Sequence, residues 1–138
     1  MYLSDSHGSV QKIWAFDLEA ASGTLTNRRL FVDMNDWPGR PDGAAVDSEG
    51  CYWICGNDAG QVHRFSPAGV LLQSIAVPVS KPAMCAFGGP ELRHLFVTSI
   101  QPASPVPGFD AALDGAVLVL EPGVQGRPEP LFSQFPVR

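Results

Sequence analysis

The sequence contains no apolar run long enough to span a bilayer, and its N-terminus lacks a basic segment followed by an apolar one. We therefore expect a soluble, cytoplasmic protein without a transmembrane helix or a secretory leader. Basic residues are scarce, since nine Lys and Arg stand against fourteen Asp and Glu and give a net charge of -5. Because these basic residues form no stripe or cluster, we expect neither nucleic acid nor membrane as a partner.

Cysteine is scarce as well, with single residues at positions 51, 55 and 85. This odd number and this spacing match no common zinc pattern. Cys51 and Cys55 would lie on the same face of one strand, too far apart to bridge readily, so we expect buried, reduced thiols. The three histidines are scattered, and we expect none to be catalytic or to bind a metal. His63 occupies an alternating strand position, where an exposed or half-packed side chain is expected.

Helical periodicity is nearly absent, because the apolar residues alternate instead of recurring every three or four positions. Fourteen Gly and thirteen Pro lie between the alternating segments, which favours many short strands joined by turns. Three similar strand-like segments end in small or polar residues, and the last two begin 43 residues apart, at Trp53 and Phe96. A spacing of about 40–50 residues is typical of a four-stranded propeller repeat. The sequence thus predicts an all-β fold that is a partial β-propeller.

The predicted propeller is a single domain over residues 1–138. It contains about two and a half blades of four-stranded antiparallel sheet, roughly at 1–34, 39–78 and 82–133. The first blade begins at its second strand, and a loop rich in Pro, Ala and Gly interrupts the third over residues 100–115. The predicted strands are Met1–Ser4, Lys12–Asp17, Arg28–Val32, Gly43–Val46, Cys51–Gly56, Gln61–Phe65, Leu71–Val77, Ala83–Phe87, His94–Ser99, Ala116–Leu120 and, weakly, Pro130–Phe132.

The segment Gly39-Arg40-Pro41-Asp42-Gly43 places one carboxylate where an extended segment begins. Pro41 restricts the backbone before Asp42 and Gly43 permits a close approach after it, so the carboxylate is placed to face a ligand at the mouth of a strand. On spacing alone a turn is the better interpretation, because Asp before Gly is a common turn pair. Further along, Asp47-Ser48-Glu49-Gly50 predicts a hairpin turn.

Several motifs follow one another along the chain: Gly39–Gly43, Gly60–Phe65, Cys85–Gly89 with Leu95–Ser99, and, before them, Ile13–Asp17 with Gly23–Arg28. Together they resemble the regucalcin/gluconolactonase family of the senescence marker protein type, and the similarity runs from Met1 to about Phe132. The resemblance implies a six-bladed propeller that hydrolyses sugar lactones with one divalent cation in its central cavity. Since the matched motifs belong to later blades, the chain resembles the C-terminal portion of the family fold.

The resemblance also implies site residues. It assigns to Asp42 the roles of metal ligand and general base, while the other ligands of the family would lie upstream of Met1. Arg40, Thr98 and Ser99 are candidates for substrate contact; otherwise Arg40 is a solvated loop residue and Thr98 and Ser99 are a polar pair at a strand end. The implied cation is Ca²⁺, Zn²⁺, Mn²⁺ or Fe²⁺. Because hard cations take several oxygen ligands, we expect the isolated chain to bind the cation weakly and to be inactive.

Three functions stay open on the sequence alone. The chain is the C-terminal part of a metal-dependent sugar lactone hydrolase, a non-catalytic partial propeller that acts as a binding or assembly module, or a propeller hydrolase with different cavity chemistry. Two to three blades leave apolar blade faces open on both sides. We therefore expect the isolated chain to self-associate through its exposed blade edges.

Overall fold

The computed structural model describes residues 1–129, in which ten strands form three antiparallel sheets. The only helical segments in this part of the chain are three 3-10 turns, Met34–Asp36, Pro90–Leu92 and Ala111–Leu113. No helix among these residues is long and apolar enough to cross a membrane. The predicted all-β class is confirmed, and the alternating apolar pattern is its cause.

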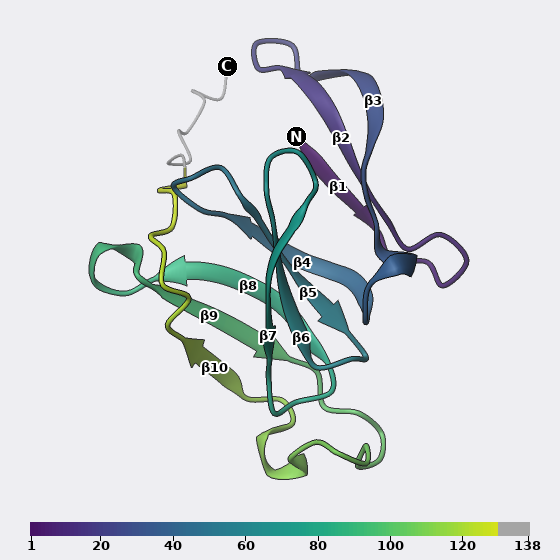
Figure 1. Cartoon of the computed structure of the whole chain (residues 1–138), viewed down its shortest axis with the longest axis vertical. Helices are drawn as coiled ribbons and strands as arrows, with labels where there is room; N and C mark the ends of the chain where they lie inside the picture. The colour runs from purple at the N-terminus through teal and green to yellow at the C-terminus, as the bar shows by residue number, and fades with distance from the viewer. Residues whose placement is uncertain (130–138) are drawn as a thin grey trace, which may run out of the picture.

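Each sheet is formed by strands that are consecutive in the chain (Figure 1). The first has the order β1-β2-β3, the second β4-β5-β6-β7 and the third β10-β9-β8. The strands are β1 Tyr2–Asp5, β2 Lys12–Glu19, β3 Thr24–Asp33, β4 Arg40–Val46, β5 Tyr52–Asn57, β6 Gln61–Phe65, β7 Leu71–Ala76, β8 Pro82–Gly88, β9 His94–Ser99 and β10 Val117–Leu120. These strands agree with the predicted set except at their ends, and the predicted strand Pro130–Phe132 lies outside the described residues.

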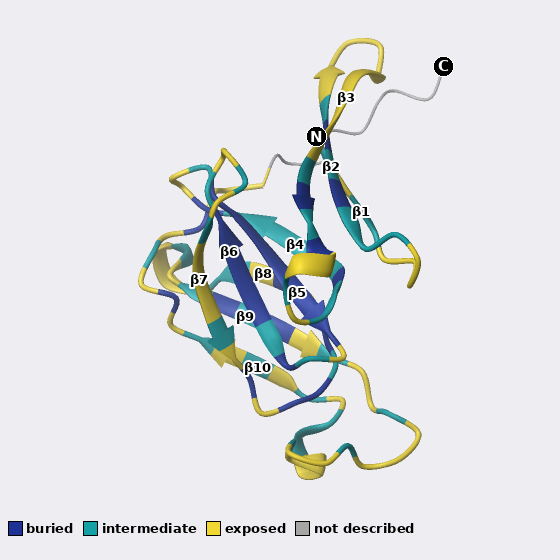
Figure 2. Cartoon of the chain, turned by 45° about the vertical axis from the view of Figure 1, so that its right-hand side comes forward, coloured by how far each residue is buried: buried dark blue, intermediate teal, exposed yellow. Residues whose placement is uncertain are grey.

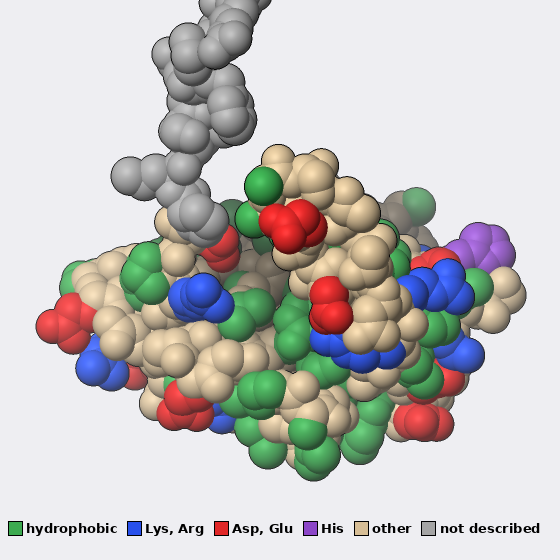
Figure 3. Space-filling model, turned by 90° about the horizontal axis from the view of Figure 1, so that it is seen from above, with side chains coloured by type: hydrophobic (Ala, Val, Ile, Leu, Met, Phe, Trp, Pro, Cys, Tyr) green, Lys and Arg blue, Asp and Glu red, His purple; other side chains and the backbone are tan. Residues whose placement is uncertain are grey.

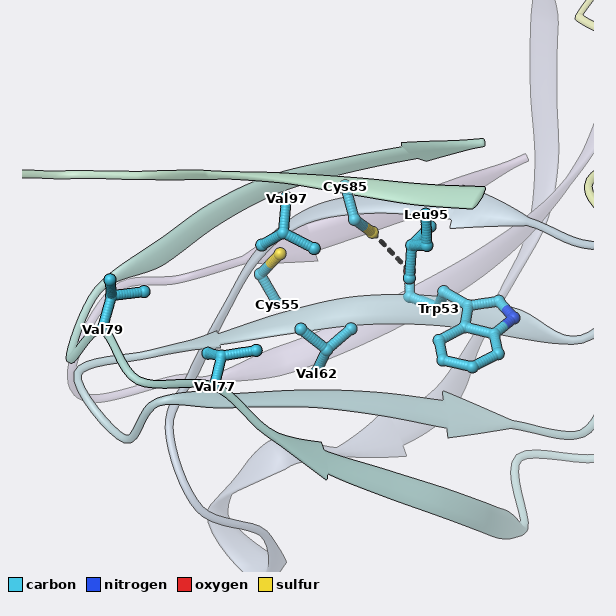
Figure 4. Packing of buried hydrophobic residues seen from close by; sticks show 8 residues of the cluster. All are labelled: Trp53, Cys55, Val62, Val77, Val79, Cys85, Leu95 and Val97. Carbon is cyan, nitrogen blue, oxygen red and sulfur yellow. Dashed lines mark hydrogen bonds between the residues drawn. The ribbon is translucent and has the colours of Figure 1, made fainter. Parts of the chain in front are cut away.

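The second sheet forms the middle layer, and β5 and β6 are its most buried strands (Figure 2). Because side chains alternate along a strand, β5 serves two cores. Tyr52 and Ile54 pack toward the first sheet, whereas Trp53 and Cys55 pack toward the third. The core between the first and second sheets contains Ile13, Val32, Met34, Tyr52, Ile54 and Phe65. The core between the second and third contains Trp53, Cys55, Val62, Val77, Val79, Cys85, Leu95 and Val97 (Figure 4).

All three cysteines are free and buried, as the sequence predicted. The Cys85 thiol lies 3.8 Å from the Trp53 carbonyl oxygen, and Cys55 lies on the facing strand of the same core (Figure 4). Interaction with Cys85 and burial both raise the pKa of the Cys55 thiol, which therefore stays protonated. These thiols act as small apolar side chains in the core.

The hairpin turn after β4 forms as predicted, but its first residue does more than turn the chain. Asp47 is fully buried and accepts hydrogen bonds from Trp53 Nε1 at 3.0 Å and Arg64 Nε at 2.8 Å. It also accepts from the backbone nitrogens of Glu49 and Cys51. Burial opposes ionisation of Asp47, yet these bonds outweigh it and lower its pKa. Asp47 thus joins β4, β5 and β6 inside the second sheet.

Candidate functional site

Asp42 lies in a β-bulge of β4. Pro41 pairs with Gly56 and Ala44 pairs with Ile54. Asp42 and Gly43 therefore lie together opposite one residue of β5, Cys55. The strand therefore begins at Arg40, before the predicted start at Gly43, and Asp42 lies within it. A bulge redirects the side chains of the residues it contains and is frequent next to active sites.

A second bulge lies beside the first, at the start of β8. Pro82 pairs with Ser99 and Met84 with Thr98, which leaves Ala83 as the extra residue. The two bulges touch, because a Cβ atom on Gly43 would lie 2.6 Å from Met84 Cα and 2.7 Å from the Ala83 carbonyl oxygen. The close approach expected at Gly43 is therefore to the backbone of the neighbouring sheet.

The Asp42 carboxylate is half-buried and is held by Asn57, the last residue of β5. Asn57 Nδ2 donates to Asp42 Oδ2 at 3.1 Å and to the Pro82 carbonyl oxygen at 3.2 Å. The Asn57 side chain is almost fully buried, and its Oδ1 has no hydrogen-bond partner. Asn57 thus links β4 to β8 at the position of the two bulges.

The loop that leads into β4 is held by His63. His63 is 1% exposed, so the prediction of an exposed or half-packed side chain is wrong. Its Nε2–H donates to the Pro38 carbonyl oxygen at 2.8 Å, and Nδ1 accepts from the Ser74 hydroxyl at 2.8 Å. Burial lowers the pKa of His63, although the bond to Pro38 opposes the shift. A neutral His63 therefore fixes the backbone that carries Arg40 and Asp42.

Arg40 is bound to Asp58 rather than to Asp42. Its guanidinium donates to Asp58 Oδ2 at 2.7 Å, and Lys81 binds the other Asp58 oxygen. Arg40 Nη1 also lies 3.5 Å from the Ser6 carbonyl oxygen. Two basic side chains thus share one carboxylate at the start of β4 and β8, and the Arg40 side chain is 41% exposed.

The hydroxyls of Thr98 and Ser99 bind backbone groups. Thr98 Oγ1 accepts from the Met84 nitrogen at 3.2 Å and so supports the bulge of β8. Ser99 Oγ donates to the Ala116 carbonyl oxygen at 2.8 Å. Ser99 pairs with Pro82, whose carbonyl binds Asn57, so its backbone lies one strand away from the Asp42–Asn57 pair.

The donor atoms at this site fit part of a cation site. Within residues 1–129, no three His, Cys, Asp or Glu side chains are grouped closely enough to hold a metal ion. The Asp42 carboxylate is an oxygen donor, the type that Ca²⁺ takes, whereas the unpaired Asn57 Oδ1 is buried. The carboxylate fits a hard divalent cation in kind, and further oxygen ligands are needed to complete its coordination.

The surface around the strands carries both charges. Acidic and basic side chains alternate with hydrophobic ones on the face drawn in Figure 3. A hollow lies between β4 and β8 further along the strands than Asp42, and its wall includes Val46, Met84 and Phe87. Arg127 and Glu129 also line this hollow and Asp42 does not, so the candidate site is the pair of bulges.

Sequence reasoning identified Asp42 but missed Asn57. The available signal was the position of Asn57 across the hairpin from Arg40, where strand pairing brings it next to the segment that contains Asp42. That signal depends on the register of β4 and β5, which the bulge changes by one residue.

Comparison with known proteins gives a consistent result. The family model described as SMP-30/Gluconolactonase/LRE-like region matches residues 1–101. The 6-deoxy-6-sulfogluconolactonase of Pseudomonas putida is 40% identical over 96% of this chain and 45% of its own length. A pentonolactonase of Haloferax volcanii is 33% identical over 93% of this chain and 45% of its own length. The chain spans about half the length of these curated relatives.

The fold agrees with the same family. A solved structure of regucalcin from Agrobacterium tumefaciens, described as a calcium-binding protein, superposes with a TM-score of 0.80 and 28% identity. The superposition covers 96% of this chain and 45% of that protein. The three sheets are blades of the same kind of propeller, and the predicted partial β-propeller is confirmed. The chain belongs to the SMP-30/gluconolactonase/LRE-like family.

Proposed function

We propose that this chain is the C-terminal part of a metal-dependent sugar lactone hydrolase, in which Asp42 is a ligand of one divalent cation and the general base. Family membership and relatives named as sugar lactonases support the reaction class. The observation that carries the assignment to Asp42 is its place in a bulge between two sheets, with one carboxylate oxygen held by a buried amide. We also propose a cytoplasmic location, which the three free thiols support.

In the proposed reaction, water adds to the lactone carbonyl and the ring C–O bond breaks, which yields the open-chain hydroxy acid. When bound, the cation supplies a Lewis acid that polarises the lactone carbonyl. Asp42 accepts the proton of the attacking water and returns it to the departing ring oxygen. Arg40 is held in place by Asp58 and keeps an exposed guanidinium edge for the substrate hydroxyls. Thr98 and Ser99 complete the proposed substrate contacts.

The isolated chain is expected to have no lactonase activity. It supplies one carboxylate at the site, whereas a hard cation such as Ca²⁺ takes about six to eight oxygen ligands. An extended form that includes residues encoded upstream is expected to supply the remaining ligands and the substrate-holding groups.

The test is hydrolysis of a panel of aldonolactones with added Ca²⁺, Mn²⁺, Fe²⁺ or Zn²⁺, measured on this chain and on the extended form. We expect activity in the extended form alone and its loss in Asp42→Ala. Asp36→Ala, which removes an exposed carboxylate near the same segment, is the matched control and should stay active. Full activity of Asp42→Ala in the extended form would show that the metal and base assignments are wrong.

A second candidate function is assembly through the outward faces of the two end sheets. On the first sheet, Leu3, Trp14 and Leu30 form one cross-strand row, and the two leucines are 44% and 50% exposed. On the third sheet, Val117 and Val119 form a row along β10 on the face opposite its core-packed leucines, and they are 60% and 55% exposed. Since the inward faces of both sheets pack on another sheet, a second copy of the chain would extend the same stacking.

Light scattering on the isolated chain tests this assembly. The expected result is a dimer or larger species at micromolar concentration, and its dissociation in Leu30→Lys or Val117→Lys. Val70→Lys, on an equally exposed turn residue outside both rows, is the control. A well-folded monomer at micromolar concentration would contradict self-association and leave the lactonase proposal unaffected.

A further inference from the structure

The side-chain amide nitrogen of Asn57 donates hydrogen bonds to two strands. Its Nδ2 carries two hydrogens, and these bind Asp42 Oδ2 on β4 at 3.1 Å and the Pro82 carbonyl oxygen on β8 at 3.2 Å. The opposite orientation of the amide would place Oδ1 against both acceptors, so these two contacts fix which atom lies where. The side chain is 3% exposed, which leaves it no room to reorient toward solvent.

This contact fixes the Asp42 carboxylate. Within residues 1–129, Asn57 is the one side chain that donates a hydrogen bond to Asp42. The bulge sets the backbone direction at Asp42, but it does not restrain rotation of the carboxylate about its own bonds. With Oδ2 held, Oδ1 is the oxygen left to a cation or a proton.

Burial of the Asn57 amide destabilises the fold, and packing alone does not explain why an amide occupies this position. Asn57 Oδ1 is buried without a partner, and an unsatisfied buried acceptor is destabilising. An apolar residue of similar volume at this position would avoid that loss. We propose that Asn57 is a positioning residue that holds Asp42 Oδ2 so that Asp42 Oδ1 faces the divalent cation; this inference rests on the proposed function.

The proposal predicts how substitution of Asn57 changes the cation affinity of the isolated chain. Hydrogen-bond partners of metal-ligating side chains contribute about 10–100-fold to metal affinity. Asn57→Leu removes the donor and also the unpaired acceptor, and it should raise the Kd for Mn²⁺ at least about tenfold. The affinity is measured from Mn²⁺-dependent broadening of the backbone amide signals next to Asp42 in the ¹⁵N-labelled chain. Thermal unfolding of each variant is measured in parallel.

Two controls separate positioning from general stability. Ser80→Ala removes another buried side-chain oxygen without a partner, on the segment before β8, and should leave Mn²⁺ affinity unchanged. Asp42→Ala should abolish the local broadening. If Asn57→Leu does not give a folded chain, Asn57→Ser takes its place, because its shorter side chain also lacks the reach to bind Asp42 and the same rise in Kd is expected.

A third measurement needs no variant. In the wild-type chain, the side-chain amide signals of Asn57 should shift on addition of Ca²⁺, because the carboxylate that they bind becomes a ligand. Unmoved signals, or a folded Asn57→Leu with wild-type Mn²⁺ affinity while Asp42→Ala loses binding, would overturn the positioning role and leave the proposed cation site standing. Wild-type Mn²⁺ affinity in Asp42→Ala would instead refute the cation site itself.

Discussion

Replacing Gly43 by alanine is expected to push β4 away from β8 and so displace the neighbouring Asp42. The added Cβ would lie 2.6 Å from Met84 Cα, 2.7 Å from the Ala83 carbonyl oxygen and 2.3 Å from Met84 Sδ. Favourable contacts between carbon atoms begin at about 3.5 Å, so the two backbones must separate by about 1 Å. The flexible Met84 side chain can move aside, but the backbone atoms of the bulge move only with the strand.

The size of the effect follows from this overlap. Insertion of one methyl group into a packed interior costs about 1–3 kcal/mol. For a chain of this length, such a loss corresponds to a fall in Tm of about 3–12 °C. A displacement of about 1 Å at a catalytic group can lower the rate about 100-fold. We therefore expect Gly43→Ala to lower the lactonase activity of the extended form even at temperatures where the variant is still folded.

The assay compares thermal unfolding of the chain with Gly43→Ala and with Gly8→Ala. Gly8 is the matched control, because a Cβ there would meet nothing within 4 Å and its backbone does not lie in the left-handed region. Gly8→Ala should have the Tm of the wild type within about 1 °C. A Gly43→Ala variant with wild-type Tm and wild-type Mn²⁺ binding would refute the packing of the two bulges and their role in holding Asp42.

Two further predictions concern buried ionisable groups. Asp47→Asn should cost about 1.5–3 kcal/mol in urea unfolding at pH 7, because Arg64 loses its buried partner and keeps only the exposed Glu49. Since folding lowers the pKa of Asp47, this cost should shrink as the pH falls below about 4, and a constant difference would refute the ion pair. Since folding also lowers the pKa of His63, wild-type stability should fall below about pH 6.5, and His63→Gln should lose less between pH 7.5 and 5. Equal losses in both proteins would show that His63 does not titrate in that range.

The strands could be predicted from the sequence because their signal is local. Aromatic and β-branched residues, bounded by turns that contain Gly and Pro, define β5 and β6 within one residue of their observed bounds. The two bulges could not be predicted in this way. Both depend on the register between neighbouring strands, and the tight contact of Gly43 with Met84 joins segments about 40 residues apart.

The interior positions of polar side chains were also beyond local patterns. The residues around Asp47 predict a hairpin turn, and the turn forms. That local pattern does not include Trp53 and Arg64, whose hydrogen bonds hold the Asp47 carboxylate in the interior. His63 alternates like an exposed strand residue, yet the loop containing Pro38 covers it. In each case, a partner distant in sequence satisfies the polar group and makes its burial possible.

At the proposed site, the position of Asp42 and the affinity for a cation depend on different parts of the protein. The position of Asp42 is set within this chain, by the bulge of β4, by Asn57 and by His63 through Pro38. Affinity for a hard cation depends on the number of oxygen ligands, and among residues 1–129 no three His, Cys, Asp or Glu side chains are grouped closely enough to hold one. The carboxylate should therefore have the same orientation in the isolated chain and in an extended form, while cation affinity rises with the extension. An Asp42 that reorients when the extension is present would mean that the neighbouring blades, and not Asn57, hold the ligand in place.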